Sequence, residues 1–297
     1  MAEDTEDFSV VKGVFQDLLN RHGFGLQYRV LKEAASAFAQ SGSSSLWRFE
    51  AAEVPVRAQN RDTKIDFILS RHRPDASLRR YLICECKRVN PARANWVFMR
   101  APYTHRKRRS GYQDMLIEAI EFREGEVKAS AHPGNMIDSF SIGLAVKTQD
   151  TGDKVGKLDD DAIEGACYQV LLGVNGFVNT LADHPYMTPR QRDLPSYALL
   201  APVIFTTAKL FVCDVDLSLA ELSTGTIDLT SSKLQQVPWL WFGYNTSPAL
   251  RHALESRSYP AELHQLMDDA YIRHVAIVNT GAIRDFLEWS SDSDSSF

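Results

Sequence analysis

Residues 64–71 read Lys-Ile-Asp-Phe-Ile-Leu-Ser-Arg, and residues 81–89 read Tyr-Leu-Ile-Cys-Glu-Cys-Lys-Arg-Val. Both stretches are short, apolar and bounded by polar residues, which is typical of β-strands. Residues 47–56 form a third stretch of this kind, weakened at its end by Pro55. These three stretches predict a meander of neighbouring strands.

Helices and further strands are expected on both sides of this meander. Apolar residues at helical spacing predict helices over residues 8–20 and 28–40 before it, and over 113–123, 161–181, 261–271 and 282–289 after it. Further strands are expected over residues 139–148, 197–207, 209–215, 224–229, 237–244 and 274–279. This order predicts one α/β domain over residues 1–290 with an inserted subregion at about 91–160, followed by a disordered tail over 291–297.

Composition restricts the class of protein. The chain has 297 residues, with 33 basic and 38 acidic side chains and a formal net charge of −5, so overall charge does not indicate a nucleic-acid-binding protein. No apolar run approaches the roughly 20 residues that span a bilayer, and the acidic N-terminus does not resemble a secretory signal. We therefore expect a cytoplasmic protein with no membrane contact, in which the 4 cysteines are small buried residues.

Asp66, Glu85 and Lys87 are the candidate catalytic residues. Glu85 and Lys87 lie two apart in a strand, so they project to one face, and Asp66 interrupts an apolar neighbouring strand. Buried carboxylates are costly unless they are paired or hold a cation, and two of them on adjacent strands can bind Mg²⁺. A lysine beside such an ion can orient the attacking water and stabilise charge on phosphorus. The set therefore suits metal-assisted phosphodiester hydrolysis, although a solvated strand face with an ordinary ion pair is the alternative.

Asp66, eighteen intervening residues and Glu85-Cys86-Lys87 resemble the PD-(D/E)XK nuclease superfamily. The resemblance implies a restriction-endonuclease-like fold, which is a mixed β-sheet flanked by helices, with the strands near residues 201–214 as the last of its core. It implies Asp66 and Glu85 as Mg²⁺ ligands, Cys86 as a ligand through its carbonyl, and Lys87 as the catalytic lysine. Ile65 stands where the family's motif has a proline.

Further site residues follow from the same resemblance. An additional upstream acidic ligand is expected, with Glu53, Glu50 and Asp17 as the candidates. Gln169 is the candidate for a glutamine that some branches carry on the helix after the catalytic strands. The implied function is a Mg²⁺-dependent endodeoxyribonuclease, with Mn²⁺ as a substitute ion and with defence against foreign DNA or DNA repair as its role. The partners left open are a second copy of the chain and a partner protein of a defence system.

A basic segment follows the proposed catalytic strands. Arg106, Lys107, Arg108 and Arg109 lie together, with Tyr103 and Tyr112 nearby. Basic residues with interleaved aromatics suit phosphate contacts and base stacking, although a solvated loop explains them equally well. The alternative function is a catalytically silent nuclease-like module that binds nucleic acid or a partner protein.

Overall fold

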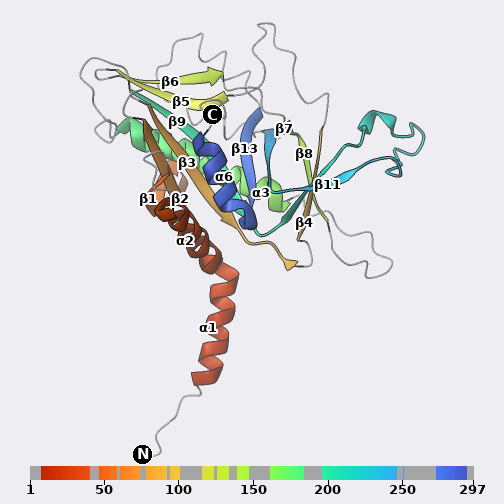
Figure 1. Cartoon of the computed structure of the whole chain (residues 1–297), viewed down its shortest axis with the longest axis horizontal. Coiled ribbons are helices and arrows are strands. Elements are labelled where there is room, and N and C mark those ends of the chain that lie inside the picture. The colour runs from red at the N-terminus through yellow and green to blue at the C-terminus, as the bar shows by residue number, and fades with distance from the viewer. Residues whose placement is uncertain are drawn as a thin grey trace, which may run out of the picture.

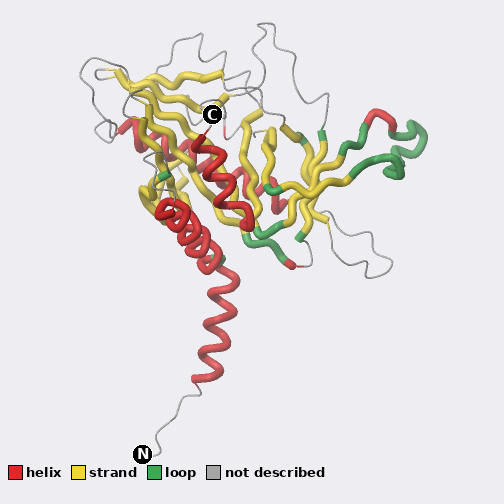
Figure 2. The backbone as a smooth tube through the Cα atoms, viewed as in Figure 1, coloured by secondary structure: helices red, strands yellow, loops and turns green. Residues whose placement is uncertain are grey.

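The computed structural model of the chain describes residues 8–40, 47–58, 61–73, 78–91, 94–100, 116–123, 126–133, 139–146, 161–183, 196–245, 250 and 272–292 (Figure 1). Within these residues the protein is a mixed α/β structure with two mixed sheets and flanking helices (Figure 2). The α/β class expected from the sequence is therefore confirmed.

The predicted meander forms one end of the larger sheet. Strands β1 (Arg48–Ala58), β2 (Arg61–Arg73) and β3 (Leu78–Lys87) pair antiparallel in chain order. β9 (Ser196–Thr206) then runs parallel to β3 along its whole length. Beyond it lie β13 (Ile272–Asn279), β12 (Trp239–Asn245) and the short β7 (Ser139–Phe140), which complete the order β1-β2-β3-β9-β13-β12-β7.

Helices cover both faces of this sheet. α3 (Asp161–Asp183) packs on one face, against an apolar cluster that includes Ile65 and Ile83. α2 (Phe24–Gln40) and α6 (Ile283–Asp292) pack on the other, against a cluster that includes Phe67 and Cys84. The predicted helical face of α3 is confirmed, since the following residues of it are all buried: Ile163, Ala166, Val170, Val174, Phe177 and Leu181.

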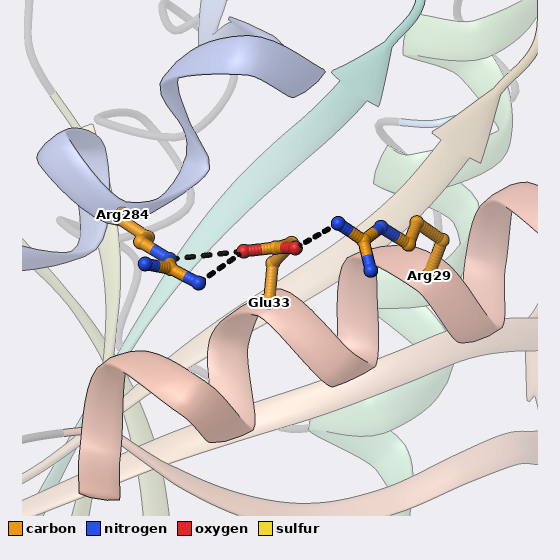
Figure 3. Close-up of polar contacts among 3 residues, drawn as sticks. All are labelled: Arg29, Glu33 and Arg284. Atoms are coloured by element: carbon orange, nitrogen blue, oxygen red, sulfur yellow. Dashed lines mark hydrogen bonds and ion pairs between the residues drawn. The ribbon is translucent and has the colours of Figure 1, made fainter. Parts of the chain in front are cut away.

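Two ion pairs that share one carboxylate join α6 to α2. Arg284 on α6 donates to the Glu33 carboxylate through Nε at 2.9 Å and through Nη2 at 2.7 Å (Figure 3). Arg29, one turn before Glu33 on α2, forms an ion pair with the same carboxylate (Figure 3). Both Arg284 nitrogens contact the same oxygen, Oε2, and the other oxygen pairs with Arg29, so Glu33 joins the two helices that cover this face of the sheet.

A second, four-stranded sheet has the order β11-β10-β4-β8. Its strands are β11 (Leu234–Val237), β10 (Lys209–Cys213), β4 (Asn95–Met99) and β8 (Ile142–Val146). β10 runs parallel to β4, and both other pairings are antiparallel. Of the two strands predicted near residues 201–214, β9 therefore belongs to the larger sheet and β10 to this second one.

Two sequence predictions were wrong. Residues 113–123 were expected to be helical, yet residues 116–123 form β5 (Leu116–Arg123), in a hairpin with β6 (Glu126–Pro133). β13 pairs β9 only from Val203 onward, which leaves the start of β9 open on that side, and β5 pairs there. Residues 224–229 are a loop instead of a strand, because short-range hydrogen bonds such as Thr224 Oγ1 to Glu221 replace strand pairing.

The ends of the described chain differ in their packing. α1 (Phe8–His22) projects away from the sheets, whereas α6 lies on them (Figure 2). α6 continues to Asp292, so the first two residues of the predicted tail are helical, and residues 293–297 lie outside the described residues. The helix expected over residues 261–271 also lies outside them. Among the described helices, none combines the length and the apolar character needed to cross a membrane.

Candidate active site

The site is centred where β2 and β3 stop pairing. Their antiparallel register reaches Phe67 opposite Cys84 and goes no further in that direction. Beyond that pair the Asp66 side chain takes over, since its Oδ2 accepts a hydrogen bond from the backbone N–H of Cys86 at 2.7 Å. The carboxylate of Asp66 is therefore bonded to β3 at Cys86, which lies between Glu85 and Lys87 in the chain.

Gln27 on α2 connects this point to β1. Its side chain is buried, and its Nε2 donates to the backbone carbonyl of Asp66 at 2.8 Å and to Oε1 of Glu53 at 2.7 Å. One amide group thus satisfies the Asp66 carbonyl at the place where β2 leaves β3. It also fixes the Glu53 carboxylate, so α2 positions two of the expected acidic residues.

Glu53 has an unusual backbone conformation. Its φ is +51°, in the left-handed region that glycine favours and that costs other residues free energy. It lies between the pairs Ala52–Phe67 and Val54–Ile65, and therefore opposite Asp66. Strained backbone of this kind concentrates at functional sites. Lys64 adds a distant ion pair to the other Glu53 oxygen at 3.7 Å.

Glu85 is the buried acid of the site. On β3, Ile83 packs in the cluster beneath α3 and Cys84 in the cluster beneath α2 and α6. Strand alternation therefore places Glu85 and Lys87 on the α3 side. Glu85 is only 4% exposed, and within the described part of the chain no hydrogen bond or ion pair joins its carboxylate to another residue.

These surroundings shift the titration of both acids. Burial raises the pKa of Glu85 to about 8, the Asp66 and Glu53 carboxylates add to that rise, and Lys87 opposes it. Burial also raises the pKa of Asp66, while the hydrogen bond from Cys86 lowers it, Glu53 raises it and Lys87 lowers it. Both acids thus respond to Glu53 and Lys87, so the four side chains form one electrostatic unit.

The acids suit a hard divalent cation. Two carboxylates and a backbone carbonyl are oxygen donors, which Mg²⁺ prefers, and burying a carboxylate beside like charges is costly unless it is paired or holds a cation. No group of three or more His, Cys, Asp or Glu side chains among the described residues could hold a metal ion. Because Mg²⁺ commonly keeps several waters and binds through one or two carboxylates, Asp66 and Glu85 remain a fitting pair of ligands.

Gln169 lies on the part of α3 that passes over the site strands. One turn further along, a Cβ on Gly173 would stand 3.0 Å from Ile65 and 3.7 Å from Ile83. Ile65 and Ile83 are close sequence neighbours of Asp66 and Glu85. Residues four apart share a helix face, so Gln169, which is half-buried, extends that same face of α3.

The remaining predicted residues fall elsewhere. Glu50 lies at a register shift in β1 and accepts a hydrogen bond from Ser70, and Asp17 is exposed on the projecting helix α1. Of the three candidates for an upstream acid, Glu53 is the one that influences the pKa of both Asp66 and Glu85. The basic segment, comprising Arg106, Lys107, Arg108 and Arg109, lies outside the described residues.

In comparisons with known proteins, no family model, curated protein or solved structure matches this chain.

Sequence reasoning missed Gln27. The predicted second helix began at residue 28, one position too late to include it, whereas α2 begins at Phe24. Gln27, Val30 and Ala34 share one buried face of that helix. A polar residue at such spacing on an apolar helix face is the signal that would have identified it.

Proposed function

We propose that the chain is a Mg²⁺-dependent endonuclease that hydrolyses phosphodiester bonds in DNA and acts in the cytoplasm. The observation that carries this proposal is the buried Glu85 carboxylate beside Asp66 and Glu53, with Lys87 two residues away on the same strand. An ordinary ion pair would leave such acids solvated or matched by bases. Here the Asp66 and Glu53 carboxylates raise the pKa of Glu85, as expected for ligands arranged for a cation.

Asp66 and Glu85 would hold the ion, with the Cys86 carbonyl as a third donor and Mn²⁺ as a substitute ion. When bound, Mg²⁺ polarises a phosphodiester and lowers the pKa of a bound water. Lys87 would orient that water and stabilise the negative charge that develops on phosphorus. Gln27 would keep Glu53 and the Asp66 backbone in place, and Glu53 would add negative charge at the site.

The order of elements supports a restriction-endonuclease-like fold. α2 precedes the β1-β2-β3 meander, α3 follows it, and β9 returns parallel to β3. Helices therefore cover both faces of a mixed sheet, as the resemblance to the PD-(D/E)XK nucleases implies. The strands of residues 95–146 are additions to this core, because they lie between β3 and α3 in the chain and join both sheets.

DNA is the proposed substrate, bound through phosphate contacts of Arg106, Lys107, Arg108 and Arg109 and through Gln169. Basic residues near a nuclease site supply the sequence-independent part of binding. Defence against foreign DNA, in concert with a partner protein of a defence system, is the role we propose for such an activity, and DNA repair is the alternative.

A catalytically silent module that binds nucleic acid is the second candidate. The two functions are separated by incubating supercoiled plasmid, linear duplex and single-stranded DNA with the protein, with Mg²⁺, with Mn²⁺ and with a chelator. Ion-dependent cleavage supports the endonuclease. Binding of DNA without cleavage in either ion supports the silent module.

A further inference from the structure

Thr207 continues the contact between β9 and β3 after their parallel register ends. The last pair of that register is Lys87 opposite Thr206. Beyond it, the backbone N–H of Thr207 donates to the Lys87 carbonyl at 3.2 Å, as a parallel strand would. The N–H of Val89, however, donates to the Thr207 hydroxyl Oγ1 at 3.0 Å. The hydroxyl therefore takes the place of a backbone acceptor at the point where the chain leaves β9.

The turn that carries Thr207 is itself fixed from two directions. Residues 207 and 208 connect β9 to β10. The buried Thr206 hydroxyl accepts a hydrogen bond from the N–H of Ala208 at 3.1 Å, and Asn279 at the end of β13 donates through Nδ2 to the Ala208 carbonyl at 2.6 Å. Both backbone polar groups of Ala208 are thereby satisfied. Thr207 is thus a well-fixed point from which to hold the end of β3.

Lys87 lies between two side chains that replace strand pairing. On the β2 side of β3, the Asp66 carboxylate accepts the N–H of Cys86, the residue before Lys87. On the β9 side, Thr207 bonds to the carbonyl of Lys87 and to the N–H two residues later. A lysine ammonium is carried on a long flexible stem, so its placement depends on the backbone and side chains that support it.

We propose that Thr207 is a positioning residue for Lys87, acting through the backbone of β3 and not by contact with DNA or the metal ion. This inference rests on the proposed nuclease function, in which Lys87 serves the attacking water. A misplacement of about 1 Å at a reacting group can cost about 100-fold in rate. Loss of the Thr207 hydroxyl should therefore slow the chemical step. It should leave the binding of DNA and of the metal ion unchanged, because other residues are assigned to both.

Steady-state cleavage of a labelled duplex by Thr207→Val, Thr207→Ser and Thr180→Val tests this role. Valine has nearly the shape of threonine but cannot accept the Val89 N–H, whereas serine keeps the hydroxyl. Thr180, whose hydroxyl donates to the Gly176 carbonyl at 3.1 Å within α3, is the matched control. We expect Thr207→Val to lower kcat by about 10- to 100-fold, with KM and the midpoint of the Mn²⁺ dependence unchanged. The serine variant and the control should retain the wild-type kcat.

Amide hydrogen exchange provides a readout that does not depend on cleavage. The Val89 N–H should exchange slowly in wild type and in Thr207→Ser, because the hydroxyl accepts it in both. It should exchange faster in Thr207→Val, while the amides within β9 and β13 keep their protection. Such a pattern would place the change at the end of β3 and not in the sheet as a whole.

The outcomes separate the role of Thr207 from the nuclease itself. If wild type cleaves DNA, an unchanged kcat in Thr207→Val, or a change in KM or in the Mn²⁺ midpoint, overturns the role of Thr207 and leaves the nuclease standing. Equal exchange of the Val89 N–H in wild type and Thr207→Val, a serine variant as slow as the valine variant, or a valine variant that does not fold also overturns it. A wild-type protein that cleaves no DNA in Mg²⁺ or Mn²⁺ overturns the nuclease, and the role of Thr207 with it.

Discussion

The Asp66 carboxylate accepts a hydrogen bond from the Cys86 backbone N–H at 2.7 Å, in place of the strand pairing that β2 and β3 make up to Phe67 and Cys84. This single contact fixes an acid of β2 against the strand that carries Glu85 and Lys87. Asp66 and Glu85, which eighteen residues separate in the sequence, therefore lie close enough to affect each other electrostatically.

Substituting Asp66 should show how much its hydrogen bond with the Cys86 N–H contributes to stability. Asp66→Ala leaves the Cys86 N–H without its acceptor, which costs about 1–3 kcal/mol of stability. Asp66→Asn retains an acceptor oxygen and should lose less, while both variants lose the charge that we propose holds a cation. Urea unfolding of the two variants without divalent ions measures the difference, and equal stabilities would contradict the role given to this hydrogen bond.

Glu85 should make stability depend on pH. Its pKa is raised from 4.5 to about 8 in the folded protein. The stability that protonated Glu85 contributes is therefore complete below about pH 4.5 and is lost as pH rises through about 8. The reason is that Glu85 ionises at a lower pH in the unfolded chain than in the folded protein. Glutamine does not ionise, so Glu85→Gln should become more stable than wild type as pH rises from about 4.5 to about 8. The difference should reach roughly a few kcal/mol, because one unit of pKa corresponds to about 1.4 kcal/mol.

Unfolding by denaturant at a series of pH values, in chelator, checks the Glu85 prediction. Glu164→Gln, which alters an exposed acid of α3, is the matched control and should show no such trend. A constant difference between wild type and Glu85→Gln over the whole range would be inconsistent with a buried, neutral Glu85.

Glu53 should carry measurable backbone strain. Glu53→Gly and Glu53→Ala both remove the carboxylate and its bond from Gln27, but only glycine adopts a φ of +51° without penalty. The glycine variant should therefore be more stable than the alanine variant by about 1–2 kcal/mol. Thermal unfolding of the pair measures this difference. An alanine variant at least as stable as the glycine variant would contradict the left-handed conformation.

The basic segment should set the salt dependence of DNA binding. Neutralising Arg106, Lys107, Arg108 and Arg109 together should weaken binding and flatten the dependence of log Kobs on log salt, by about 0.9 for each lost phosphate contact. Titrations of a labelled duplex at several salt concentrations measure the slope. A slope equal to that of wild type would place the binding surface on other residues.

The sequence was sufficient to predict elements whose pattern is local. The apolar residues Ile65, Phe67 and Leu69 around Asp66 predicted the strand β2, although Ile65 packs beneath α3 while Phe67 and Leu69 pack beneath α2 and α6. α3 was predicted for the same reason, since its apolar residues recur at helical spacing. β5 was not, because residues 116–123 become a strand through pairing with the open side of β9, about eighty residues further along the chain.

For the candidate site, the sequence indicated residue types and could not indicate their arrangement. Asp66, Glu85 and Lys87 were identified from strand spacing, and the burial of Glu85 and the departure of β2 from β3 required the structure. The left-handed Glu53 has no local signature, because glutamate is not a residue that favours this conformation. Gln27 joins β1 and β2 from a helix, which is a tertiary relationship that strand patterns do not encode.

Cleavage of supercoiled plasmid by wild type, Glu85→Gln, Lys87→Ala and the control Glu164→Gln tests the central claim most directly. With Mg²⁺ or Mn²⁺, we predict cleavage by wild type and by the control. We predict a loss of most activity in both site variants, which should still bind DNA, because metal binding and charge stabilisation each contribute about several kcal/mol. Full activity in Glu85→Gln would contradict the site assignment, and a wild-type protein inactive in both ions on every form of DNA would contradict the nuclease itself.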